Sequence, residues 1–159
     1  MACPGHRGTW PGPGHRRDHT TARHRATRGP LMSESTETMT ELAAAALDQA
    51  GDGIIVIDPA GIIQLWNEQA TALFGFTAEQ AIGQNVEIII PERLREAHEH
   101  GFDAAMATGH LASDGKPRRT RGVTADGGKV YVTMTFAVIN GADGAAVGAV
   151  AVAREYVKE

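Results

Sequence analysis

The last third of the chain constrains the fold most, because three strand-like segments follow one another there with only short turns between them. The segments are RRTRGV (118–123), KVYVTMTFAVI (129–139) and AAVGAVAVAREY (145–156). The separators ADGG (125–128) and NGADG (140–144) consist of residues that form tight turns easily. Because short turns join neighbouring antiparallel strands, this part of the chain predicts a three-stranded antiparallel sheet.

Two more strands and three helices are predicted upstream. GIIVID (53–58) and IIQLWN (62–67) are separated by a short turn and predict a second hairpin. Two short helical segments, EQATALFG (68–75) and TAEQAIG (77–83), each end at a glycine. A longer helix is predicted from Pro91 as its first residue through Thr108, with Gly109 as its stop. This order predicts an α+β fold with helices on one face of an antiparallel sheet.

The chain divides by charge into two unlike parts. Residues 1–31 contain six arginines and one acid, whereas residues 32–159 contain nine basic and eighteen acidic residues, a net charge of −9. The first part lacks apolar periodicity, so we expect a disordered basic prefix. Two alternatives stay open for it: an arm that binds nucleic acid, or an upstream stretch that is not translated because the protein starts at Met32.

A short helix is expected before the first strand. Thr40 is its predicted N-cap and Asp48 its last residue. Its apolar stripe consists of Leu42, Ala43, Ala46 and Leu47. The stripe is either a docking face for a partner or a cap over the open side of the sheet. We therefore expect an N-terminal helix or cap at residues 32–51 and the main domain at residues 52–156.

Charge and motifs exclude several classes of function. An acidic domain repels nucleic-acid phosphates and anionic lipid headgroups, so direct binding to either is not expected. No segment is apolar for long enough to be a secretion signal or a membrane span, which predicts a cytoplasmic protein. The only cysteine, Cys3, lies in the prefix, so no disulfide or thiolate zinc site is expected in the domain. No catalytic motif is present, so we expect a binding protein and not an enzyme.

The main domain resembles the PAS family. The stretch DGIIVIDPAGIIQLWNEQATALFGFTAEQAIGQNVEIIIPE (52–92) is similar to the amino-terminal half of a PAS domain, and ADGGKVYVTMTFAVI (125–139) is similar to its characteristic tail strand. The resemblance covers roughly residues 40–155. It implies a PAS fold, in which a five-stranded antiparallel sheet with short helices on one face cups a small molecule. It also implies a sensory module that forms a homodimer.

Helical phase separates the histidines of the predicted helix 91–108. The residues that recur at spacings of three and four are Leu94, His98, Phe102, Ala105 and Met106. This apolar stripe predicts that His98 points inward. His100 lies about 200° around the helix from His98, so it should be solvated beside Arg93, Glu96 and Asp103. His110 follows the stop glycine and is expected in a loop.

The same helix resembles the haem-binding PAS domains of rhizobial oxygen-sensing kinases. The shared positions, without a gap, are Pro91, Glu92, Arg95, His98, Thr108 and Gly109. The resemblance implies that His98 is the iron ligand of a haem b. It also implies that Arg118 reaches bound dioxygen, and that Leu94 and Phe102 contact the cofactor. A neutral imidazole suits iron ligation, and a guanidinium can stabilise negative charge on a bound gas.

Other interpretations of the cavity stay open. His98 could instead form a hydrogen bond in a cofactor-free core, and a one-residue shift of RRTR would change which arginine faces the pocket. Ser113 and Asp114 stand where apolar contacts with a porphyrin are expected, so this loop is either displaced or prevents a porphyrin from fitting. GQNVEIII lacks the cysteine of flavin photoreceptors of the LOV type, which excludes adduct chemistry and makes flavin less favoured than haem.

Two functions are therefore expected from the sequence. The first is a haem-based gas or redox sensor that signals in trans, because the chain ends at VAREYVKE without an output module. A kinase or a transcription regulator is the expected partner. The alternative is a cofactor-free PAS module that acts by dimerisation and protein interaction.

Overall fold

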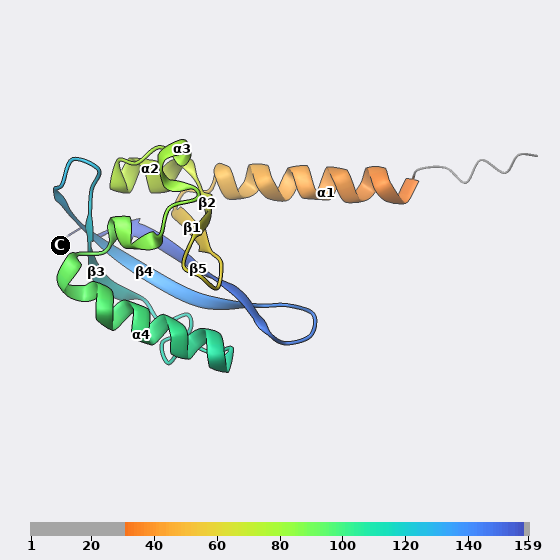
Figure 1. Cartoon of the computed structure of the whole chain (residues 1–159). Helices are drawn as coiled ribbons and strands as arrows, with labels where there is room; N and C mark the ends of the chain where they lie inside the picture. The colour runs from red at the N-terminus through yellow and green to blue at the C-terminus, as the bar shows by residue number, and fades with distance from the viewer. Residues whose placement is uncertain (1–30, 158–159) are drawn as a thin grey trace, which may run out of the picture. The chain divides into compact units, whose positions relative to one another are not determined.

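The computed structural model describes residues 31–157, which contain a five-stranded antiparallel sheet (Figure 1). The strands are β1 (Gly53–Ile57), β2 (Ile63–Trp66), β3 (Arg118–Val123), β4 (Lys129–Asn140) and β5 (Ala146–Glu155). The helices are α1 (Leu31–Asp48), α2 (Glu68–Phe74), α3 (Ala78–Ala81), the 3-10 helix η1 (Val86–Ile89) and α4 (Glu92–Thr108). The predicted α+β class and the five-stranded antiparallel PAS-type sheet are confirmed.

The strand order β2-β1-β5-β4-β3 places the first and last strands of the chain side by side. β1 pairs with β5 along its whole length, from Gly53 opposite Ala153 to Ile57 opposite Ala149. The hairpins β1–β2, β3–β4 and β4–β5 supply the other three pairings, as the short turns predict. The central strands β1 and β5 therefore hold the two halves of the sequence together.

One face of the sheet packs against α2 and α4 (Figure 1). Residues alternate between the two faces of a strand, so every second residue points to these helices. The fully buried large side chains on this side are Phe74, Ile55, Ile63 and Val132. Each contributes about 1.5–3 kcal/mol by removing apolar surface from water. Gly122 of β3 leaves room for Phe74, because a Cβ atom there would lie 2.6 Å from Cε1 of that ring.

Asn67 is a buried polar residue at the junction between β2 and α2, with only 2% of its surface exposed. Its Oδ1 accepts hydrogen bonds from the backbone N–H groups of Ile54 (2.8 Å) and Ala70 (3.0 Å). Its Nδ2 donates to the backbone oxygens of Leu47 (2.8 Å) and Asp52 (2.9 Å). The Asn67 amide therefore donates two hydrogen bonds and accepts two, so all its polar atoms are paired. A polar group can be buried at low cost only when it is paired in this way.

The N-terminal helix differs from the prediction, because it begins at Leu31 and not at Thr40. Thr40 is inside the helix, where its hydroxyl donates to the backbone oxygen of Thr36, four residues earlier (2.9 Å). A threonine can form this bond within a helix as well as cap one, which is why residue type alone misplaced the start. The predictions for residues 1–30 lie outside the described part of the chain.

The side chains of residues 35–49 are exposed, so the apolar stripe of α1 has no buried contact with the described residues. Met39 and Leu42 are 62% and 61% exposed. A cap over the sheet would bury this stripe, so the docking interpretation agrees better with the observed exposure. Within residues 31–157, we found no helix with the length and apolar character needed to cross a lipid bilayer.

Two smaller differences concern the segment before α4. Pro91 is the N-cap of α4 and not its first residue. The 3-10 helix η1 was not predicted, and it is capped by Asn85, whose Oδ1 accepts from the N–H of Glu87 (2.9 Å). Four residues are too few to show helical periodicity, so only the cap could have indicated it.

Replacing Asn67 tests the role of its four hydrogen bonds. Asn67→Asp keeps an acceptor for Ile54 and Ala70 but places a carboxylate beside the oxygens of Leu47 and Asp52. We expect a loss of about 3 kcal/mol in the free energy of unfolding, because buried acceptors lose their donors and a charge is buried. Urea unfolding followed by circular dichroism measures it.

Asn85→Asp is the matched control, because Asn85 acts only as an acceptor at an exposed cap. Aspartate caps a helix as well as asparagine does, so the change should stay within about 0.5 kcal/mol. Equal losses in the two variants would contradict the role assigned to Asn67.

Candidate functional site

A cavity of about 610 Å³ lies between α4 and the sheet. This size is within the range of roughly 300–1,000 Å³ that is typical of sites for small molecules and cofactors. β1, β4 and β5 supply one wall, α4 supplies the opposite wall, and the loop after α4 lines one end. The space is therefore enclosed by the same elements that the PAS resemblance implies.

Small residues create this space. The residues without a side chain beyond Cβ that line the cavity from α4 and β5 are Ala97, Gly101, Ala104, Ala105, Ala149 and Ala151. Larger apolar side chains, Ile55, Ile57, Phe102 and Phe136, complete the walls. Two secondary elements that meet through alanine and glycine leave room between them, so the volume follows directly from residue size.

His98 lies on the inner face of α4, as predicted, and is half-buried. It borders both the main cavity and a smaller cavity of about 150 Å³. Its ring stacks in parallel with Phe102, with centroids 6.1 Å apart and planes 5° from parallel. Burial lowers the pKa of His98, and the carboxylate of Glu87 opposes this effect. The imidazole is thus neutral near pH 7 and has a lone pair available for a metal.

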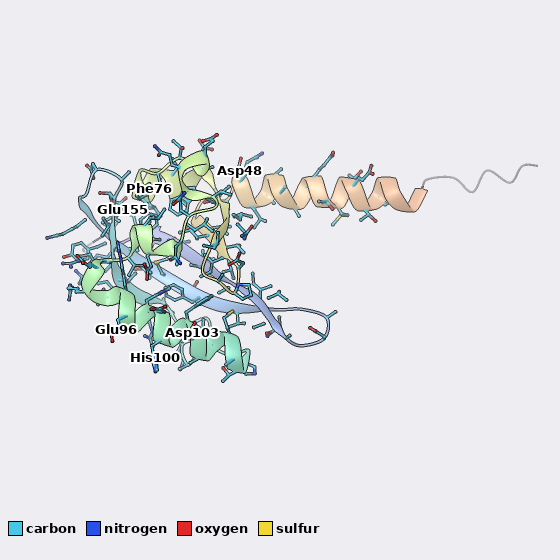
Figure 2. The ribbon with its side chains drawn as sticks, viewed as in Figure 1. Asp48, Phe76, Glu96, His100, Asp103 and Glu155 are labelled. Carbon is cyan, nitrogen blue, oxygen red and sulfur yellow. The ribbon has the colours of Figure 1, made fainter. Side chains whose placement is uncertain are left out.

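His100 has the opposite environment. It is exposed, and Figure 2 shows His100 and Glu96 on the side of α4 that is turned away from the sheet. His110 is exposed in the loop after α4 and lines one end of the cavity. The predicted separation of His98 from His100 is therefore confirmed, whereas the contribution of His110 to the cavity was not predicted.

The structure separates the other predicted site residues. Phe102 lines the main cavity together with His98. Leu94 borders only the smaller cavity, where it lies with His98 near Phe74 and Met134. Leu94 is one turn of α4 before His98, so it shares the stripe but lies beside a different space. A ligand confined to the main cavity would contact Phe102 and not Leu94.

Arg118 and Arg119 lie on opposite faces of β3. Arg118 lines the main cavity, and its side chain forms no hydrogen bond or ion pair with any residue in the described part of the chain. The guanidinium of Arg119 lies over the rings of Tyr156 (4.2 Å to the centroid) and Tyr131 (5.2 Å). The register of β3 against β4, with Arg118 opposite Met134, settles which arginine faces the cavity.

The loop between α4 and β3 is part of the cavity wall. Ser113 is buried and lines the cavity, whereas Asp114 is exposed and accepts a hydrogen bond from the backbone N–H of Leu111 (3.3 Å). The N–H of Gly115 donates to the backbone oxygen of Phe136 on β4 (3.2 Å). The loop is therefore attached to the sheet and is not displaced from the pocket. The alternative, that this loop prevents a porphyrin from fitting, stays a prediction that the haem test below addresses.

The donor set fits a cofactor that needs one protein ligand. Among residues 31–157, no group of three or more His, Cys, Asp or Glu side chains could hold a free metal ion. Haem brings four nitrogen ligands of its own and needs only an axial imidazole from the protein. One neutral histidine at the wall of a mostly apolar cavity matches that requirement.

Sequence reasoning missed most of the wall. Ala149 and Ala151 occupy alternate positions of β5, so a run of small residues with period two was the available signal. The small residues of α4 gave a similar signal at helical spacing. His110 lies in a loop, where no periodicity indicates the direction of a side chain. Ser113 of the same loop was expected at the pocket only through the resemblance to haem-binding PAS domains.

Comparisons with known proteins agree with the geometry. A family model described as the PAS fold matches residues 41–155. The sensor protein FixL of Bradyrhizobium diazoefficiens is 52% identical over 48 residues, which are 30% of this chain and 10% of FixL. The oxygen sensor protein DosP of Escherichia coli is 26% identical over 95 residues, which are 60% of this chain and 12% of DosP.

A solved structure shows the same fold. The crystal structure of the PAS domain of a Colwellia psychrerythraea protein superposes with a TM-score of 0.63 at 27% identity, over 76% of this chain and 99% of that domain. By contrast, the matches with FixL and DosP span about a tenth of those proteins. The similarity thus concerns one domain of each relative.

The lowered pKa of His98 predicts a pH-dependent stability. In the unfolded chain His98 titrates near its ordinary value of 6.5, and in the folded protein it titrates lower. Below 6.5 the unfolded state binds more protons, so this contribution to stability is complete above 6.5 and is lost as the pH falls towards the folded pKa. Unfolding in urea at about pH 7.5 and about pH 5.5 measures the loss.

The loss should be smaller in His98→Phe than in the unmodified protein. His100→Phe is the control, because His100 is exposed on the same helix, and it should lose as much as the unmodified protein. Identical losses in all three proteins would show that burial of His98 does not affect its titration.

Proposed function

This chain belongs to the PAS family, and from that premise we propose that it is a sensory domain that binds haem b and signals to a partner. The observation that carries the proposal is the neutral, half-buried imidazole of His98 at the wall of a cavity of about 610 Å³ with mostly apolar lining. The names of the relatives support it, because FixL is a sensor protein and DosP is an oxygen sensor protein. Flavin is the less favoured cofactor.

Each residue has a role that follows from its position. When bound, haem supplies reversible binding of a diatomic gas such as dioxygen at its iron. His98 would hold the group, and the parallel ring of Phe102 restricts the orientation of that imidazole. The alanine and isoleucine walls would contact the apolar body of the group, and Arg118 would provide hydrogen-bond donors towards a bound gas. The site acts by binding and release, so no catalytic step is proposed.

The output is proposed to be in trans, to a kinase or a transcription regulator. The rhizobial kinases that the sequence resembles support a kinase. Haem or gas binding would change the population of two conformations of the domain, and a partner would read that change.

A haem titration tests the proposal. Protein purified from haem-supplemented cells should show a Soret absorption band, because His98 supplies the axial ligand. The band should be lost in His98→Ala and kept in His100→Ala, in which an exposed histidine of the same helix is removed. A wild-type protein that stays colourless after reconstitution with haem would remove the proposed cofactor.

A second candidate function is a cofactor-free PAS module that acts by dimerisation. The exposed stripe of α1 favours it, since Met39, Leu42 and Ala46 recur at spacings of three and four on one side of the helix. Two such stripes from two copies of the chain can pack against each other and bury the exposed methionine and leucine.

Sedimentation velocity tests the dimer. A dimer is expected for the unmodified chain, and Leu42→Glu should shift it to the monomer, because a carboxylate would be buried in the interface. Ala44→Glu adds the same charge about 200° around the helix and should leave the dimer intact. If both variants remain dimeric, α1 is not the interface.

A further inference from the structure

The main cavity differs in charge from the domain around it. Residues 32–159 carry a net charge of −9. However, none of the described residues that line the cavity is an aspartate or a glutamate. Arg118 is the one permanently charged side chain among those lining residues. The cavity is thus a local cationic site in an acidic domain.

Arg118 is available because nothing in the described chain neutralises it. Its side chain forms no hydrogen bond or ion pair with residues 31–157, and the residue is exposed. The nearby loop carboxylate of Asp114 accepts from the N–H of Leu111 and does not line the cavity. Two other arginines of the sheet are engaged: Arg154 forms two 2.8 Å hydrogen bonds with Asp52, and Arg119 stacks on two tyrosines. Arg121, whose buried Nε has no hydrogen-bond partner among the described residues, borders the smaller cavity and does not line the main one.

The remaining lining residues determine which kind of ligand body fits beside Arg118. Ile55, Ile57, Phe102 and Phe136 surround the space with apolar surface. Ser113, a residue with only 8% of its surface exposed, also lines the cavity and adds a hydroxyl group to its wall. An arginine presents parallel N–H donors that match a carboxylate, sulfonate or phosphate, and such charge-assisted bonds are about twice as strong as neutral ones.

We propose that the cavity selects amphipathic anions, ligands with a flat apolar body and one acidic group, and that Arg118 binds the acidic group. The proposal rests on the ligand-binding role given above and names the class of ligand. It concerns an iron-free ligand that occupies the cavity in place of haem. The test therefore uses the protein without haem.

Two fluorescent probes with the same aromatic body test the charge preference. 8-Anilinonaphthalene-1-sulfonate carries an acidic group, whereas N-phenyl-1-naphthylamine has none. Titration of the full chain should show one site at which the probes displace each other. The Kd of the sulfonate should be lower than that of the neutral probe by about tenfold, which is the gain expected from one charge-assisted pair.

Variants of the adjacent arginines identify the residue responsible. Arg118→Gln should raise the Kd of the sulfonate by about tenfold and leave that of the neutral probe within about twofold. Arg119→Gln removes the same charge one residue away on the opposite face of β3 and should change neither. Because Arg118 is exposed and unpaired, its removal should not affect folding, which circular dichroism checks.

Three outcomes would overturn the proposal: equal affinity for both probes, an equal effect of the two variants, or binding of neither probe. The result is separable from the haem proposal. A protein that prefers the sulfonate through Arg118 but stays colourless with haem keeps the anion site and loses the cofactor. A protein that binds haem through His98 but does not discriminate between the probes keeps the cofactor and loses the anion site.

Discussion

The rest of the structure depends on the four hydrogen bonds of the Asn67 side-chain amide. The amide joins the last turn of α1, the start of β1 and the first turn of α2 through four hydrogen bonds. β1 is a central strand, and its residues Ile55 and Ile57 form part of the cavity wall. A single buried side chain therefore determines where the central strand begins, and through that strand it positions one wall of the binding site.

The cavity combines two features that arise from different levels of structure. Its volume comes from small residues at helical spacing on α4 and at alternate positions on β5. Its charge comes from the edge strand β3, where pairing with β4 turns Arg118 inward and Arg119 outward. His98 lies between these features, on the helix and at the boundary of the main and smaller cavities.

Local periodicity explains which features could be predicted from the sequence. The strands, the short helices and the separation of His98 from His100 depend on residue spacing within one element, so pattern alone was sufficient. The inward direction of Arg118 depends on pairing with another strand, and a shift of one residue would have selected Arg119. Leu94 was correctly predicted on the apolar stripe of α4. Which cavity a residue of this stripe borders depends on its position along the helix axis, and Leu94 borders the smaller one.

The missed start of α1 and the missed contribution of His110 to the cavity have a different cause. A threonine such as Thr40 can cap the start of a helix or lie inside it. Which of the two occurs depends on whether the residues before it are helical. Ser113 and His110 take their directions from a loop that is held by the backbone bond between Gly115 and Phe136, a contact between distant parts of the sequence. Such contacts have no signature in a single sequence.

The alanine lining has a consequence for affinity. Alanine has no rotatable side-chain torsion, so the wall formed by Ala97, Ala104, Ala105, Ala149 and Ala151 loses no conformational entropy when a ligand enters. It also has no long side chains that could fold into the space and fill it. The backbone therefore defines the shape of the cavity before a ligand enters. Binding has to order few side chains, chiefly that of Arg118, so the entropic cost of binding is small.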